Sequence, residues 1–234
     1  MAIINRPPRH RPFWLPAETS LIEGVRWLIQ LRWLAIAGVI GALLAGIYLF
    51  HLPLFWQGIL VVSLFLALLN LVYYLILQRR YKGREKDPDA LNRAVFFAHL
   101  QIFLDLFLLT LLLYFAGGPL NPFNFFYIFH IIITSILISR RDSYLQSAWA
   151  VILFISLVLL TASGKVDYFP LYPGLDHRLF LGPRQILLII GAFSITIFIA
   201  AFLTNSIMET LRRREEELAR AYEEVAKREK IKSE

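Results

Sequence analysis

Of the 234 residues in this chain, 58% are hydrophobic and only 18% are charged, and the mean hydropathy is +0.60. A soluble domain needs a more polar surface than this composition supplies, so the sequence indicates an integral membrane protein. The basic residues are not interleaved with base-stacking aromatics, which argues against nucleic acid as a partner, and the absence of cysteine excludes disulfides and thiolate metal sites within the chain.

Six apolar stretches reach the roughly 17 to 25 residues that a helix needs to cross a bilayer. The predicted fold class is therefore all-α: an integral membrane six-helix bundle followed by a C-terminal cytoplasmic helix. We divide the chain into a cytoplasmic N-terminal segment (1–25), a six-span transmembrane domain (26–208) and a cytoplasmic connecting helix (209–234). The expected spans are Trp33–Phe50, Phe55–Leu77, Ala94–Phe115, Phe123–Ser139, Tyr144–Ala162 and Gln185–Leu203.

The basic residues predict the orientation in the membrane. Of the 24 lysine and arginine residues, all except Lys165, Arg178 and Arg184 fall in segments that this topology places on one side. Because basic loops stay on the cytoplasmic side, we expect a multi-pass protein of the bacterial cytoplasmic membrane with both termini in the cytoplasm.

Small residues in the first span predict close helix packing. They recur every four residues on two adjacent rows, the spacing that lets helix backbones approach each other. Packing inside the six-helix bundle is the favoured interpretation, and a dimer interface is the alternative. The rows are Ala37, Gly41 and Ala45, and Gly38, Ala42 and Gly46.

One acidic residue, Asp105, lies well inside a predicted span. A carboxyl at this depth is costly unless it is protonated or has a polar partner, so it marks either a functional site or a structural hydrogen bond. Gln101 lies one turn earlier, and His130 in the fourth span is predicted at a similar depth. We expect Asp105 and His130 to form an intramembrane polar pair. His99 and His130 differ too much in depth to ligate one haem iron, and no metal site is expected.

The predicted ligand site is the connection between the third and fourth spans, Gly-Gly-Pro-Leu-Asn-Pro-Phe. It combines flexible glycines with a rigid Asn-Pro corner and a following run of aromatic residues. A quinone ring could lie near Phe123 and Phe126 and accept hydrogen bonds from the Asn121 amide and from the N–H groups of the glycines. Residue chemistry alone favours a simple turn over this site. The candidate residues are Gly117, Gly118, Asn121, Pro122, Phe123 and Phe126.

Two further segments complete the chain. The loop Ser163–Arg184 is rich in proline and aromatic residues, which we expect to lie on the membrane surface. After the sixth span the helix is predicted to continue from Thr204 to Lys232 without a breaker. Its apolar residues follow a 3-4 spacing that favours a parallel coiled coil, and hence a homodimer, over a solvated single helix.

The run Leu104-Asp105-Leu106 and the segment Tyr114–Phe123 resemble the membrane sensor of RegB/PrrB-type redox-responsive sensor histidine kinases. Members of that family have six spans and the heptapeptide GGxxNPF, which is associated with ubiquinone binding. The resemblance implies a membrane input module that senses ubiquinone or menaquinone, signals through the C-terminal helix to a cytoplasmic kinase region, and has membrane lipid and a response regulator as partners.

Catalytic residues are not predicted in this chain. None of its five histidines has the following acidic residue and nearby proline of a phosphoacceptor motif, so autophosphorylation by the chain alone is not expected and the enzyme class stays open. Two other functions remain as alternatives. They are a small membrane transporter or channel, and the membrane anchor of a quinone-linked oxidoreductase.

Overall fold

The computed structural model describes residues 20–80, 88–171 and 182–233. Within these ranges the chain forms helices joined by turns and loops, which confirms the all-α prediction. Short 3₁₀ helices, η1 (Gly118–Leu120) and η2 (Pro122–Phe125), connect α3 to α4. The long elements are α1 (Ser20–Tyr48), α2 (Trp56–Arg80), α3 (Pro88–Phe115), α4 (Phe126–Leu137), α5 (Arg140–Ser163) and α7 (Pro183–Ser233).

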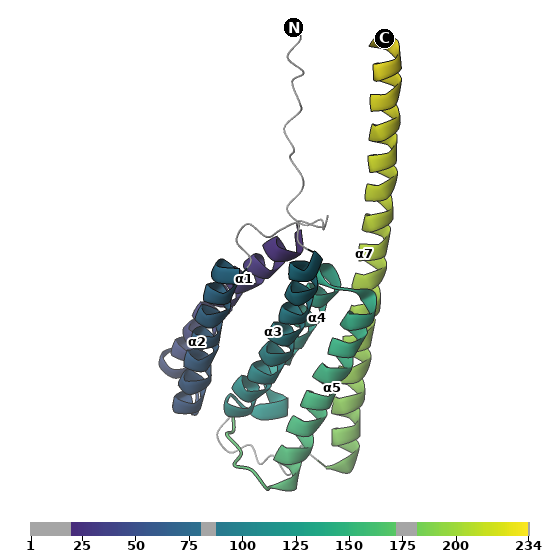
Figure 1. The fold of residues 1–234 in the computed structure, drawn as a ribbon. Helices are drawn as coiled ribbons and strands as arrows, with labels where there is room; N and C mark the ends of the chain where they lie inside the picture. The colour runs from purple at the N-terminus through teal and green to yellow at the C-terminus, as the bar shows by residue number, and fades with distance from the viewer. Residues whose placement is uncertain (1–19, 81–87, 172–181, 234) are drawn as a thin grey trace.

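These helices make the chain a multi-pass membrane protein. In the described part of the chain, α1, α2, α3, α5 and α7 contain apolar stretches long enough to cross a bilayer. Together with α4, these helices alternate in direction. Helices α1, α3 and α5 run downward in Figure 1, and α2, α4 and α7 run upward. We call the end that carries residues 116–125 the loop end, and the end beyond which α7 extends the stalk end.

The fourth apolar helix is shorter than the predicted span Phe123–Ser139. Helix α4 has 12 residues, and the apolar segment as a whole covers Pro122–Leu137. At 1.5 Å per residue, α4 alone is about 18 Å long, against roughly 30 Å of hydrocarbon. It ends at Leu137 because Ile138 has an extended backbone and Ser139 caps α5 by accepting a hydrogen bond from Asp142 N.

Helix α3 is shared by two groups of helices. On one side it packs against α1 and α2, and on the other against α4 and α5, while α7 packs against α4 and α5 (Figure 1). The main core runs through both groups. It includes Leu106 of α3, Tyr127 of α4, Phe154 of α5 and Ile197 of α7, and it continues into α1 and α2 through residues such as Leu28 and Tyr73. A smaller apolar core joins α1 and α2 to the other face of α3. Any displacement of α3 therefore affects both groups.

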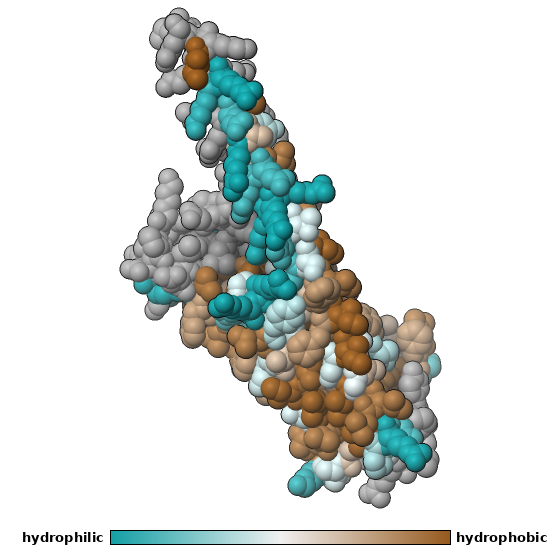
Figure 2. Space-filling model, turned by 90° about the vertical axis from the view of Figure 1, so that its right-hand side faces the viewer, coloured by the Kyte–Doolittle hydropathy of each residue, from teal (hydrophilic) through white to brown (hydrophobic). Residues whose placement is uncertain are grey.

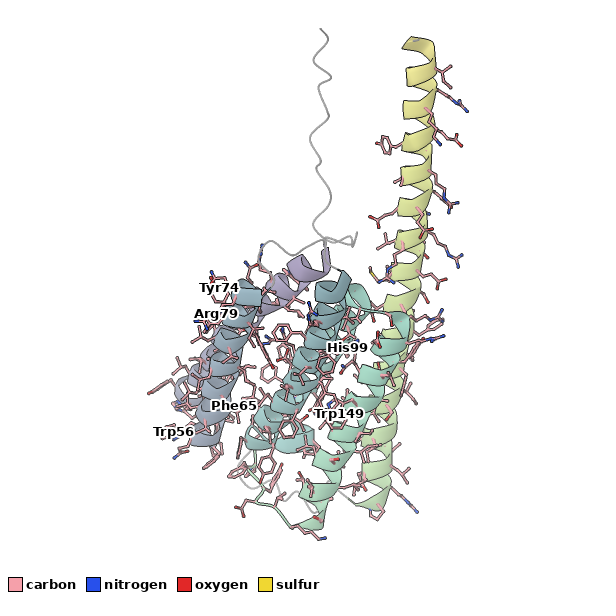
Figure 3. The ribbon with its side chains drawn as sticks, in the orientation of Figure 1. Trp56, Phe65, Tyr74, Arg79, His99 and Trp149 are labelled. Atoms are coloured by element: carbon pink, nitrogen blue, oxygen red, sulfur yellow. The ribbon has the colours of Figure 1, made fainter. Side chains whose placement is uncertain are left out.

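The exterior of the bundle is apolar, as contact with lipid requires. Figure 2 shows a hydrophobic surface over the lower part of the molecule and a hydrophilic one along the extended end of α7. Helix α2 has Trp56 near its loop end and Arg79 near its stalk end, residue types that favour the two interfaces of a membrane (Figure 3). The bundle therefore has an apolar band with polar groups at its ends.

The small residues of α1 do not pack inside the bundle at every position. Gly46 lies against Leu54, but Gly38 and Gly41 face open space, with nothing within 4 Å of where a side chain would begin. The favoured prediction of packing within one bundle is therefore wrong for these two glycines. No described residue of this chain covers them.

Helix α7 continues without interruption from the bundle into a polar stalk, residues 209–233, as predicted. Leu218, Tyr222 and Val225 on the stalk are 60%, 74% and 54% exposed. Helices α1 and α7 also run through the proposed domain borders at 25/26 and 208/209, whereas most of the proposed N-terminal segment lies outside the described residues.

Two glycines of the α1–α2 pair provide a test of this packing. A Cβ at Gly58 would lie 2.6 Å from the Phe115 ring and 2.7 Å from the Phe55 ring, whereas one at Gly41 meets nothing. Overpacking costs typically 1–3 kcal/mol, so we expect Gly58→Ala to lower the apparent melting temperature of the purified protein in detergent. Gly41→Ala is the control and should leave it unchanged or raise it. Equal melting temperatures for the two variants would contradict the packing.

Candidate functional site

The loop between α3 and α4 depends on its two glycines. Gly117 has φ +113° and Gly118 has φ +64°, backbone conformations that side chains disfavour. A Cβ on Gly117 would also come within 2.9 Å of Leu171 Cβ, in the connection that follows α5. The glycines therefore let the loop turn sharply and pack against that connection.

Asn121 holds the loop together. Its side chain is 3% exposed, its Oδ1 accepts a hydrogen bond from Phe123 N at 2.7 Å, and its Nδ2 donates to Ala116 O. Pro122 begins η2, where its fixed φ suits the first helical position. This geometry uses the amide within the loop, and the expected hydrogen bond from the Asn121 amide to a quinone stays a prediction.

Four phenylalanines form an exposed cluster where the loop enters α4. Their side chains are 39–47% exposed, so one face of the cluster is open to the surroundings of the bundle. The rings of Phe125 and Phe126 stack with centroids 4.8 Å apart, and Phe126 lies 5.7 Å from Phe123 and 5.6 Å from Phe129. We call Phe123, Phe125, Phe126 and Phe129 the aromatic cluster. It includes both aromatic residues predicted for the ligand site, and Phe125 and Phe129 extend it.

His130 lies one helical turn after Phe126, beside the aromatic cluster. It is partly exposed, and its Nδ1 is 3.0 Å from the backbone oxygen of Phe126. Asp105 is instead bonded to Arg32. The expected Asp105–His130 pair is therefore not formed.

A second candidate site is a polar cluster buried among α1, α2 and α3. The Arg32 guanidinium donates to Asp105 Oδ2 at 2.6 Å through Nη2 and at 3.1 Å through Nε. It also donates to Asn70 Oδ1 at 3.0 Å and to Gln101 Oε1 at 3.1 Å. Arg32 is 5% exposed and the Asp105 side chain 10%, so this ion pair is almost completely removed from solvent and lipid.

Neighbouring groups fix the position of Arg32. Asn70 Nδ2 donates to the Ile29 carbonyl of α1 at 3.0 Å, and the Arg32 guanidinium carbon lies 5.0 Å from the centre of the Tyr73 ring. Tyr73 Oη and Gln101 Nε2 are buried without a hydrogen-bond partner among the described residues. The cluster therefore fixes the position of the Arg32 guanidinium, and two of its polar groups remain without a hydrogen bond in the described part of the chain.

Sequence reasoning missed Arg32 because it was counted with the basic residues before the first span. The helix was predicted to start at Leu21 and α1 begins at Ser20, but the predicted span began only at Trp33, so Arg32 was assigned to the membrane surface and not to the interior of the bundle. A signal was available in the sequence. The Asp105 carboxyl requires a polar partner inside the membrane, and Arg32 directly precedes the first predicted span. Asn70, Gln101 and Asp105 all stood out as intramembrane polar residues, but their common partner did not.

At the stalk end, the turn between α4 and α5 is bonded to α7. Arg212 donates to the Ile138 carbonyl at 3.2 Å, and Asn205 Nδ2 donates to Ser143 Oγ at 3.2 Å. Ser143 Oγ is in turn 2.7 Å from Ser135 Oγ of α4. Helix α4 thus has the aromatic cluster at one end and hydrogen-bonded contacts to the base of the stalk at the other.

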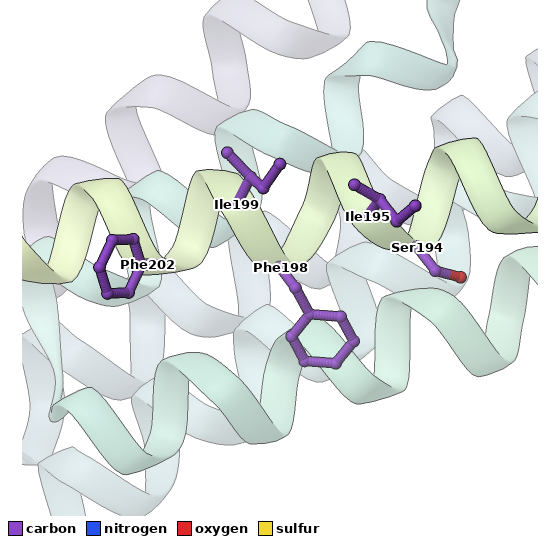
Figure 4. Close-up of a pocket in the computed structure, with 5 residues that line it drawn as sticks. All are labelled: Ser194, Ile195, Phe198, Ile199 and Phe202. Atoms are coloured by element: carbon purple, nitrogen blue, oxygen red, sulfur yellow. The ribbon is translucent and has the colours of Figure 1, made fainter.

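A shallow groove lies on the outer face of α7. It is lined by Ser194, Ile195, Phe198, Ile199 and Phe202 (Figure 4). Its lining is apolar apart from one serine and includes no residue of the loop or the polar cluster. His99 is also outside both sites, and its Nε2 lies 3.5 Å from Asp142 (Figure 3).

Comparison with known proteins identifies the transmembrane region. A family model described as a PilS-like transmembrane domain matches residues 51–218, which include α2 to α5 and the bundle part of α7. Comparison with curated proteins returned no match. Comparison with solved structures returned none either.

The buried ion pair leads to a double-mutant prediction. Arg32→Met or Asp105→Leu alone should cost about 3–5 kcal/mol of folding free energy, because each leaves one buried charge without a partner. The double variant leaves neither charge, so we expect it to recover much of that loss. The measurement is the apparent melting temperature in detergent. If the double variant were as unstable as the sum of the single losses, the pairing would be wrong.

The loop geometry predicts a stability effect for Asn121. Asn121→Ala removes two hydrogen bonds, worth about 1 kcal/mol each, whereas Asn124→Ala removes the single bond to the Pro119 carbonyl. We therefore expect Asn121→Ala to lower the apparent melting temperature more than Asn124→Ala does. Wild-type stability of Asn121→Ala would instead assign the side chain a role outside the loop.

Proposed function

We propose that this chain, which belongs to the family of PilS-like transmembrane domains, is the membrane input module of a sensor histidine kinase. The family is one of six-span membrane domains of such kinases, and its match covers most of the chain. The uninterrupted α7 supports the proposal, because one helix joins the bundle to a polar stalk suited to contact a cytoplasmic kinase region. The stalk corresponds to the connecting helix 209–234.

The finer proposal is that the module responds to the redox state of the quinone pool. The observation that carries it is the aromatic cluster, four partly exposed phenylalanines beside the Gly-Gly-Pro-Leu-Asn-Pro-Phe loop. A quinone headgroup is flat and apolar, so it can stack on such rings from within the membrane. Ubiquinone or menaquinone is the proposed ligand, and no metal is part of the mechanism.

Signal transfer would follow α4. A headgroup lying on Phe126 and Phe129 favours one placement of the first turns of α4. The turn after α4 and the first turn of α5 are hydrogen-bonded to α7 through Ile138–Arg212 and Ser143–Asn205, and Ser143 is bonded to Ser135 of α4, so a shift of α4 changes the base of the stalk. A ligand moves such an equilibrium only by its differential affinity, and a 100-fold preference corresponds to about 2.7 kcal/mol.

Orientation and assembly belong to the same proposal. The basic residues at the stalk end favour a cytoplasmic position for both termini in a bacterial inner membrane. The exposed apolar residues of the stalk favour a homodimer, which would join two stalks in a short coiled coil. A response regulator would then act downstream of the kinase region.

Quinone binding to the purified chain in lipid nanodiscs tests this assignment. We expect saturable binding to wild type and about fivefold to 150-fold weaker binding to the double variant Phe126→Leu/Phe129→Leu, because two stacking surfaces are lost. Each contact is worth about 0.5–1.5 kcal/mol. Phe65→Leu is the matched control, since Phe65 is an exposed phenylalanine on α2, away from the loop (Figure 3).

The control should bind quinone as wild type does. Equal affinity of the double variant and wild type would remove the aromatic cluster from the site. The absence of binding to any variant, with both ubiquinone and menaquinone, would contradict quinone sensing and leave the input-module function in place.

A further inference from the structure

We infer that His130 Nε2 binds the headgroup of the reduced ligand, so that the site prefers a quinol to the corresponding quinone. The inference rests on the proposed function, because it assumes that a quinone-type ring lies on the aromatic cluster. It names the residue that forms a hydrogen bond to the ligand and the redox form of the ligand that the site prefers. It also gives the site a means of telling the two forms apart.

The first step concerns the proton on the imidazole ring. His130 Nδ1 lies 3.0 Å from the Phe126 carbonyl oxygen. A carbonyl oxygen only accepts hydrogen bonds, so Nδ1 has to carry the hydrogen. In a neutral imidazole the other nitrogen then has a free lone pair. Nε2 is therefore an acceptor, and its role is fixed by the backbone of its own helix.

The second step concerns the position of that acceptor. His130 is four residues after Phe126, so it lies one turn further along the side of α4 that carries the Phe126 ring. The side chain is partly exposed, and Nε2 has no hydrogen-bond partner among the described residues. An acceptor at the edge of an aromatic surface inside a membrane can bond a polar group of a ring stacked there.

The third step is the chemistry of the two ligand forms. A quinol presents hydroxyl groups, which donate hydrogen bonds, whereas a quinone presents carbonyl oxygens, which only accept them. Nε2 therefore bonds the quinol and leaves the quinone carbonyl unpaired. No covalent bond is formed or broken and no electron is transferred. The protein distinguishes the two forms only by how tightly it binds them.

Asn121 does not compensate for this difference. Its Nδ2 donates to Ala116 O and its Oδ1 accepts from Phe123 N, so this predicted donor is engaged within the loop, and Gly117 and Gly118, whose N–H groups were the other predicted donors, are buried. His130 lies beside the aromatic cluster, and its Nε2 can still accept a hydrogen bond from a ligand.

The test compares both redox forms of a short-chain ubiquinone, titrated under anaerobic conditions into the protein in nanodiscs. Wild type should bind the quinol about fivefold more tightly, the equivalent of one neutral hydrogen bond of about 1 kcal/mol. His130→Phe keeps a ring but removes the acceptor, so the ratio of affinities should fall to about one. His130→Gln offers an NH2 donor as well as an acceptor oxygen, so it can bond either form and should also bring the ratio close to one.

Three results would overturn the inference. Equal affinities of wild type for both forms, or an unchanged ratio in His130→Phe, would remove His130 from the site and leave quinone binding intact. The absence of binding of either form to wild type would overturn the proposed quinone function together with the inference. An unaltered melting temperature of His130→Phe is the control for folding, and if it falls, the ratio in His130→Gln decides.

Discussion

The pairing of Arg32 with Asp105 is the constraint on which this bundle depends. A charge in hydrocarbon is costly, and either residue alone would be without a partner. Together with Asn70 and Gln101 they satisfy one another across α1, α2 and α3, and they fix the α1–α2 pair on α3. Because α3 leads directly into the loop, the same interaction fixes the position of the loop and of the first turn of α4.

The loop after α3 places the proposed ligand site at the start of α4. The positive φ values of Gly117 and Gly118 and the hydrogen bonds of Asn121 make a compact loop, and the loop presents the aromatic cluster at the beginning of α4. Since α4 is short and ends in contact with α7, few residues separate the proposed ligand from the stalk. A short helix of this kind is well suited to transmit a displacement, because its two ends move together.

Much of this organisation was predictable, because membranes impose strong rules on sequence. The spans, the loop at Gly117–Phe123 and the unbroken α7 follow from apolar length and turn chemistry. Arg32 was not predicted, since a basic residue near a helix end usually marks an interface, and only tertiary contact shows it buried with Asp105. The early end of α4 was missed because Ile138 is apolar, and its extended backbone comes from the capping by Ser139.

The claim that a ligand at α4 moves α7 is tested most directly by a distance measurement. The chain has no cysteine, so spin labels can be placed at Leu145→Cys on α5 and Leu218→Cys on the stalk, both exposed positions. Pulsed electron paramagnetic resonance in nanodiscs would give the distance distribution with and without quinol. We predict a shift on binding that is absent in Phe126→Leu/Phe129→Leu. An unchanged distribution with quinol bound would contradict the account.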